Sequence, residues 1–237
     1  MNEVLAAQST VLALTQLRVV YIATYGGNHC LSYRAMAMRE VNVRDKDEGG
    51  LSWLGGHTGW WQVSREERYF CAELYRVVHG KEAQFVKFLN RKCEQRLNEQ
   101  ANWELAYEVC FYRDWEKADY PVPYPELSKK RTFDLVLFSA AQIVLFEAKA
   151  QQSYSRSQLE YLKADRNMIG ECIGCQSQDI DTPEILTAGI KSGRYDAQAG
   201  TLGYFDLCLN WSDLAEWCTW DSHATQVFKR ADCVYGS

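Results

Sequence analysis

Near its centre the chain reads Phe133-Asp-Leu-Val-Leu-Phe-Ser-Ala-Ala-Gln-Ile-Val-Leu-Phe-Glu-Ala-Lys149, in which a four-residue spacer separates two apolar runs. This spacing predicts a tight β-hairpin whose turn is centred between Ala140 and Ala141. In that register the numbers of paired residues sum to 281, so Asp134 lies directly opposite Glu147. Opposed side chains of an antiparallel pair have Cβ atoms about 4.5–5.5 Å apart, a separation at which like charges repel.

A third charged residue, Lys149, lies two positions after Glu147 and therefore points to the same face of the predicted strand. Two carboxylates and an ammonium in apolar strands reduce stability. We therefore interpret Asp134, Glu147 and Lys149 as a functional cluster that faces a cleft at one end of a buried sheet. Both faces of the hairpin are apolar, which is typical of a sheet covered on both sides; on the carboxylate side the neighbours are Val136, Phe138, Ile143 and Leu145.

The rest of the chain predicts an α/β fold. We expect an N-terminal helical extension at residues 1–60 and a second domain at residues 61–237. In this domain Ser64-Arg-Glu-Glu67 has the pattern of a capping box, which begins a helix that ends near Val78. Together with the hairpin, the remaining elements predict an α/β/α sandwich around a central mixed β-sheet. These are helices over 81–98, 157–166 and 212–218, and strands over 103–113, 184–190 and 203–209.

Composition restricts the class of protein. The chain has 237 residues, of which 47% are apolar and 24% charged, as in ordinary globular proteins. The apolar stretch at 11–25 is too short to span a bilayer. The nine cysteines, an odd number without regular spacing, suit a reducing compartment. We therefore expect a cytoplasmic protein with no membrane partner.

The net charge of −5 argues against strong nonspecific binding to nucleic acid. The acidic excess is confined to residues 151–237, which carry seven basic and twelve acidic side chains. Basic residues nevertheless cluster directly before the hairpin, at Lys129, Lys130 and Arg131. Two interpretations of this cluster stay open: a solvated loop, or a contact to nucleic-acid phosphates.

The trio resembles the signature of the PD-(D/E)XK nucleases, a superfamily with the restriction-endonuclease-like fold. In that signature an Asp is followed, after a hairpin, by Glu-x-Lys, and the matching residues here are Asp134, Glu147 and Lys149. Phe133 stands where the Pro of the name would stand. The resemblance covers roughly residues 60–210.

Two flanking residues extend the resemblance. In many members a helix before the hairpin contributes a Glu, and here Glu67 shares the apolar face of the predicted helix with Phe70, Cys71 and Leu74. Glu66 and Glu73 lie on an adjoining face of that helix. Many members also place a Gln on the helix that follows the Lys strand, and the matching residue is Gln158.

The resemblance implies a metal-dependent endonuclease that hydrolyses phosphodiester bonds in DNA, with Mg²⁺ or Mn²⁺ as its cofactor. Such ions prefer oxygen ligands, which Asp134, Glu147, the backbone carbonyl of Ala148 and Glu67 would supply. Lys149 would orient or deprotonate the attacking water and help to neutralise the charge of the transition state. We expect Gln158 to position a ligand, a water or a phosphate. A homodimer would suit cleavage of both strands.

Two alternatives are kept. The chain could be a non-catalytic nucleic-acid-binding or structural protein with the same fold. It could instead be an unrelated α/β protein in which the trio is only a buried ion-pair cluster. Cys172-Ile-Gly-Cys175 has metal-ligand spacing, but a single pair does not make an iron–sulfur or zinc site, and we expect free thiols at Cys172 and Cys175.

Overall fold

The structure is a computed structural model, and it describes residues 66–121, 123, 129–176, 181–196 and 200–235. All of these residues belong to one compact unit of the chain. The predicted N-terminal extension, the domain boundary after residue 60 and the cap at Ser64 lie outside the described residues.

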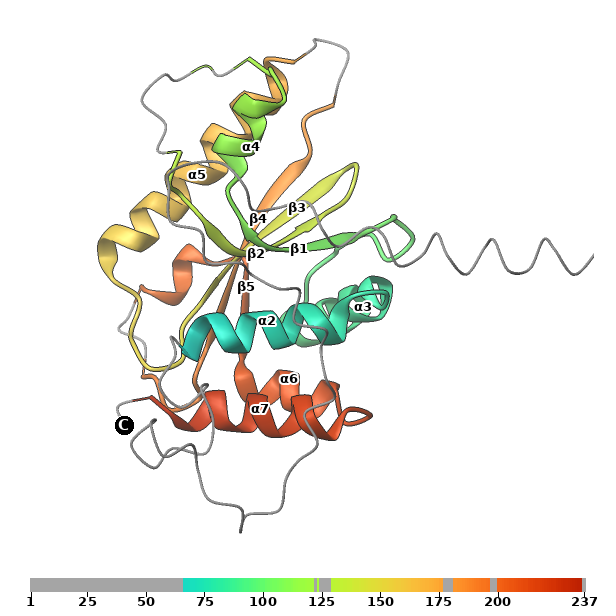
Figure 1. Cartoon of the computed structure of the whole chain (residues 1–237), viewed down its shortest axis with the longest axis vertical. Helices are drawn as coiled ribbons and strands as arrows, with labels where there is room; N and C mark the ends of the chain where they lie inside the picture. The colour runs from blue at the N-terminus through green and yellow to red at the C-terminus, as the bar shows by residue number, and fades with distance from the viewer. Residues whose placement is uncertain (1–65, 122, 124–128, 177–180, 197–199, 236–237) are drawn as a thin grey trace, which may run out of the picture. The chain divides into compact units, whose positions relative to one another are not determined.

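A mixed five-stranded sheet forms the centre of this unit (Figure 1). Its strands lie side by side in the order of the chain, so that β3 is central. The pairs β1–β2 and β2–β3 are antiparallel, whereas β3–β4 and β4–β5 are parallel. The strands are β1 (Glu104–Val109), β2 (Phe133–Phe138), β3 (Gln142–Ala148), β4 (Glu184–Lys191) and β5 (Leu207–Asn210).

The hairpin β2–β3 has the predicted register. Leu135 pairs with Phe146 and Leu137 pairs with Val144, so the numbers of paired residues sum to 281. Every residue of β3 is buried, which explains why its sequence is apolar on both sides. The prediction of a sheet covered on both faces is therefore confirmed.

Helices cover both faces of the sheet (Figure 1). One face packs against α2 (Glu66–Val78), α3 (Glu82–Cys93), α6 (Trp211–Trp217) and α7 (Ser222–Cys233). The other face packs against α4 (Phe111–Lys117) and α5 (Arg156–Gly174). Alternate residues of the hairpin divide between the two cores: Leu135 and Phe146 face the first group of helices, whereas Val136 and Leu145 face the second. The predicted α/β class is thus confirmed, with a mixed sheet at its centre.

The helix predicted over 81–98 ends earlier, at Cys93. Glu94 has a left-handed backbone with φ of 54°, which stops the helix. The side chain of Asn90 then holds the following segment: its Oδ1 accepts the N–H of Leu97 at 2.8 Å, and its Nδ2 donates to the carbonyl of Leu97 at 2.9 Å. The residues after Cys93 are good helix formers, so tertiary hydrogen bonds override their propensity here.

The last third of the chain differs from prediction in three places. The strand predicted over 203–209 is a short 3₁₀ helix, Leu202–Tyr204, followed by β5. Helix α6, predicted to begin at residue 212, begins at Trp211 and is capped by Asn210. Helix α7 was not predicted, and earlier in the chain α4 replaces the end of the strand predicted over 103–113. In the part of the chain that the structure describes, no helix has the length and apolar character needed to span a membrane.

Candidate active site

Asp134 and Glu147 enter the site from neighbouring strands, near the first residue of β2 and the last of β3. The register places them opposite each other, one step beyond the last pair, Leu135 with Phe146. Oδ2 of Asp134 accepts the backbone N–H of Ala148 at 2.8 Å. This bond ties the side chain of Asp134 to β3 and holds it beside Glu147.

Lys149 lies between the carboxylates of two different elements. Its Nζ is 3.0 Å from Oε1 of Glu147 and 3.5 Å from Oε2 of Glu67, which is on α2. Glu147 and Lys149 are each only 6% exposed, so water screens their charges weakly. The indole of Trp211 donates to the backbone carbonyl of Lys149 at 2.9 Å and fixes this end of the strand. The structure thus brings together Asp134, Glu147, Lys149 and Glu67 as predicted.

Burial and the closely spaced charges of the cluster shift the pKa values of Asp134 and Lys149. Burial raises the pKa of Asp134 to about 7, with the negative charge of Glu147 as the second cause. Burial by itself would lower the pKa of Lys149, but the surrounding carboxylates, Glu147 first, outweigh it and raise that pKa. The ammonium is therefore held in its charged form, whereas Asp134 is poised to take up a proton near neutral pH.

Arg131 is a member of this site that the sequence analysis did not place there. Its Nη2 lies 3.9 Å from Oε2 of Glu147, and its Nε donates to Oδ2 of Asp165 on α5 at 2.8 Å. Asp165 is 3% exposed and also accepts the hydroxyl of Tyr112 at 2.7 Å. The position of Arg131, three residues before Asp134 in the chain, was the available signal. Nothing in the sequence points to its partner Asp165.

Glu108 occupies the position on β1 that faces Asp134, because Tyr107 pairs with Leu135 and Val109 with Phe133. Its backbone is left-handed, with φ of 50°, which is costly for a residue with a Cβ. Its carboxylate forms an ion pair with Arg68 at 2.8 Å. Glu108 is thus a third acid in the same row of the sheet as Asp134 and Glu147, but its charge is balanced by Arg68.

The residues around the hairpin end carry an excess of acid that would suit a divalent cation. Four carboxylates gather with only two cations: Glu67, Asp134, Glu147 and Asp165 with Arg131 and Lys149. Within the described residues, no group of three or more His, Cys, Asp or Glu side chains is arranged to hold a metal ion unaided. Mg²⁺, however, uses only one or two carboxylates and keeps several waters. The raised pKa of Asp134 has burial as its first cause and the negative charge of Glu147 as its second, so these two carboxylates are the candidate ligands for such an ion.

Gln158 lies at the start of α5, where it takes part in a capping box. Its side-chain oxygen accepts the N–H of Ser155 at 3.2 Å, and its own N–H donates to the Ser155 hydroxyl. The structure therefore gives Gln158 a structural partner, and its role toward substrate stays a prediction.

The predicted basic cluster divides between surface and site. Lys129 forms an ion pair with Glu116 at 2.7 Å, and Lys130 is exposed, whereas Arg131 turns inward.

The two other acids of the helix that carries Glu67 are not placed in the acidic cluster. Glu73 forms an ion pair with Arg76 at 2.6 Å. The side chain of Glu66 lies outside the described residues.

Cys172 is buried, and Cys175 is exposed at the end of α5. Burial raises the pKa of the Cys172 thiol to about 11, which disfavours the thiolate form that metal binding needs.

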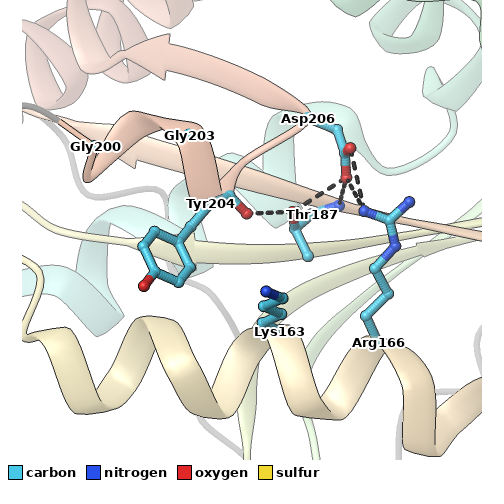
Figure 2. A pocket seen from close by; sticks show the side chains of 7 residues that line it. All are labelled: Lys163, Arg166, Thr187, Gly200, Gly203, Tyr204 and Asp206. Carbon is cyan, nitrogen blue, oxygen red and sulfur yellow. Dashed lines mark hydrogen bonds and ion pairs between the residues drawn. The ribbon is translucent and has the colours of Figure 1, made fainter.

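A cavity of about 260 Å³ opens between α5 and the β4–β5 edge of the sheet (Figure 2). Figure 2 shows Arg166 and Thr187 converging on Asp206, while the amine of Lys163 points into the space between them and Tyr204. Arg166 pairs with Asp206 at 3.0 Å, and the N–H of Thr187 donates to the same carboxylate at 2.8 Å. None of the predicted site residues lines this cavity. Because this cavity holds a single acid that is already paired with Arg166, we place the candidate active site at the acidic cluster.

In comparisons with known proteins, no family model, no curated protein and no solved structure matches the chain. The case for a function therefore depends on the geometry of the acidic cluster.

Proposed function

We propose that this protein is a metal-dependent nuclease that hydrolyses phosphodiester bonds in DNA, with a core of the restriction-endonuclease-like type. The observation that carries the proposal is the pair Asp134 and Glu147, two acids forced together on adjacent strands with Lys149 3.0 Å from one of them. A stable fold has little use for two facing acids in a buried sheet, because their mutual repulsion reduces stability.

The arrangement of elements supports the same proposal. Helix α2, which carries Glu67, precedes the hairpin. Helix α5, which carries Gln158 in its first turn, follows it. These are the positions at which PD-(D/E)XK nucleases place a Glu and a Gln. Glu67 contacts Lys149, so the helix before the hairpin contributes an acid to the site.

Asp134 and Glu147 would hold a Mg²⁺ or Mn²⁺ ion, with the Ala148 carbonyl and Glu67 as further oxygen donors. When bound, such an ion supplies Lewis-acid stabilisation of the phosphate charge and acidifies a water. The chain's own residues do the rest. Lys149 carries a fixed positive charge next to the reacting phosphate and orients the attacking water, and Glu147 holds the Lys149 ammonium in place through the 3.0 Å contact.

The competing interpretation is a purely structural ion-pair cluster. It accounts for the contact between Lys149 and Glu147, because a buried base beside a buried acid is a common structural pair. It does not account for Asp134, whose burial next to Glu147 raises its pKa to about 7. A neutral side chain at this position would make the fold more stable, so a purely structural cluster has no reason to keep an acid there.

The deciding experiment is a cleavage assay with supercoiled, linear and single-stranded DNA and with RNA, in Mg²⁺ or Mn²⁺. Wild type is compared with Asp134→Asn and Lys149→Met, and with Lys87→Ala, an exposed residue of α3 that is not part of the acidic cluster, as a control. We expect cleavage by wild type and the control and none by the two site variants. Cleavage that survives in both site variants would assign it to another site or to a contaminant.

A further inference from the structure

Arg131 has a guanidinium group whose position is fixed by two contacts, with Asp165 and Phe133. Its Nε donates to Asp165 at 2.8 Å, and Asp165 is held in turn by the hydroxyl of Tyr112 at 2.7 Å. The guanidinium carbon lies 4.9 Å from the centroid of the Phe133 ring, in cation–π geometry. Asp165 and Tyr112 are buried, so this support is rigid.

One donor of this fixed group is unused. Nη2 of Arg131 is buried and has no hydrogen-bond partner among the described residues. The acceptor nearest to it in an ion pair is Oε2 of Glu147, at 3.9 Å, which is too long for a hydrogen bond. Lys149 approaches the other oxygen of the same carboxylate at 3.0 Å. Two cations therefore flank Glu147. One of them, Arg131, has an Nη2 donor without a hydrogen-bond partner beside Oε2 of that carboxylate.

An unused donor on a buried charged group is costly, and native proteins rarely retain one without a role. If Arg131 served only to neutralise Asp165, the fold would need nothing beyond the 2.8 Å contact. A guanidinium held by one edge offers its remaining N–H groups as a planar fork, which matches the oxygens of a phosphate group.

We propose that Arg131 is a substrate-binding residue of this site, and that its Nη2 donates to a non-bridging oxygen of the phosphodiester. Asp165 and Tyr112 are positioning residues, because they act through Arg131 and do not themselves reach Glu147. The inference rests on the proposed nuclease function and extends it with a specific phosphate contact. It also assigns the basic residues before the hairpin: Arg131 contacts the substrate, while Lys129 is occupied by Glu116.

The test is duplex binding measured without turnover. The affinity of a short fluorescein-labelled DNA duplex is followed by anisotropy in EDTA, between about 50 and 200 mM KCl. Arg131→Met should weaken binding about tenfold to a hundredfold, because a hydrogen bond to a charged group is lost. The slope of log affinity against log salt should also fall by about one. Lys87→Ala removes the same charge from a position outside the acidic cluster and should change neither quantity.

A second variant guards against misfolding, because Arg131→Met leaves Asp165 buried without its cation. Arg131→Met/Asp165→Asn removes both charges and keeps an acceptor for Tyr112, and it should show the same loss of affinity and of salt slope. If both variants bind the duplex as wild type does while wild type cleaves DNA, the assignment of Arg131 is wrong and the nuclease proposal stands. If folded wild type neither binds nor cleaves nucleic acid, the nuclease proposal fails and the role of Arg131 fails with it.

Discussion

The ammonium of Lys149 lies 3.0 Å from Oε1 of Glu147, and each side chain is only 6% exposed. Lys149 also reaches Glu67 on α2, so one cation links the central strand to a helix on the opposite side of the sheet from α5. This contact makes the cation of the proposed reaction part of the fold itself. Changes at Lys149 should therefore affect stability as well as cleavage.

Lys149→Met should abolish cleavage and reduce the free energy of unfolding by about 3–5 kcal/mol, because Glu147 is then left buried beside Asp134 without its cation. Cleavage is measured with plasmid DNA and stability by urea denaturation. The double variant Lys149→Met/Glu147→Gln removes both charges and should regain most of the stability but no activity. Full activity in the single variant would exclude Lys149 from the reaction.

Asp134→Asn should stabilise the metal-free protein above neutral pH. The pKa of Asp134 is raised to about 7 in the folded state from 3.8, so the folded protein holds a proton that the unfolded chain releases between these values. The contribution of Asp134 to stability is therefore complete below pH 3.8 and is lost as the pH rises to about 7.

At pH 8 the Asn variant should be more stable than wild type by about 2–4 kcal/mol, because the amide never carries the buried charge. Its amide oxygen can still accept the Ala148 N–H, so it is a matched replacement. Denaturation at several pH values measures the difference between the two proteins. A difference that does not grow between pH 4 and 7 would contradict the electrostatic account of this site.

Millimolar Mg²⁺ or Mn²⁺ should raise the melting temperature of wild type, because an ion that binds only the folded protein stabilises it. The gain should increase with pH up to about 7, since binding displaces the proton of Asp134. Glu147→Gln and Asp134→Asn should lose the effect. A shift of equal size in these variants would place the ion elsewhere on the protein.

Gln158 has two separable roles to test. Gln158→Ala removes the capping box of α5 and should cost about 1 kcal/mol of stability. Gln158→Glu keeps an acceptor for the Ser155 N–H but lacks the amide donor, so it should retain wild-type stability and cleave more slowly. Thermal denaturation and cleavage rates are compared for both variants. If Gln158→Glu cleaves at the wild-type rate, the residue is a helix cap alone.

Gly189 is the neighbour of Glu147 on β4, and the ring of Phe205 lies directly over it. A Cβ at this position would be 2.9 Å from the ring, so Gly189→Ala should cost about 1–3 kcal/mol by overpacking. Gly189→Ala/Phe205→Leu should recover part of this loss by making room. A single variant as stable as wild type would show that the ring moves freely, and melting temperatures decide between these outcomes.

Local sequence accounts for much of the central sheet. Two continuous apolar runs within residues 133–149 predicted strands that are buried on both faces. The length of the spacer between them predicted their register, with Leu135 opposite Phe146. Because side chains alternate strictly along a strand, this register was enough to place Asp134, Glu147 and Lys149 on one side. The start of α5 was also readable to within one residue, because the helix predicted from residue 157 begins at Arg156.

Other features depended on residues far apart in the chain. The end of α3 at Cys93 follows from the hydrogen bonds of Asn90 to Leu97, which compete with helix propensity. The 3₁₀ turn before β5 accompanies the packing of the Phe205 ring on Gly189, a contact that no local pattern announces.

The sequence by itself determined the hairpin, its register and the gathering of two acids and a lysine, because strand alternation and turn length are local properties. Only the tertiary structure decided what surrounds them. It brought Glu67 of α2 to Lys149, pointed Arg131 at Glu147 and anchored it on Asp165. These contacts join residues that are 16 to 82 positions apart in the chain, and packing of helices on both faces of the sheet brings them within reach.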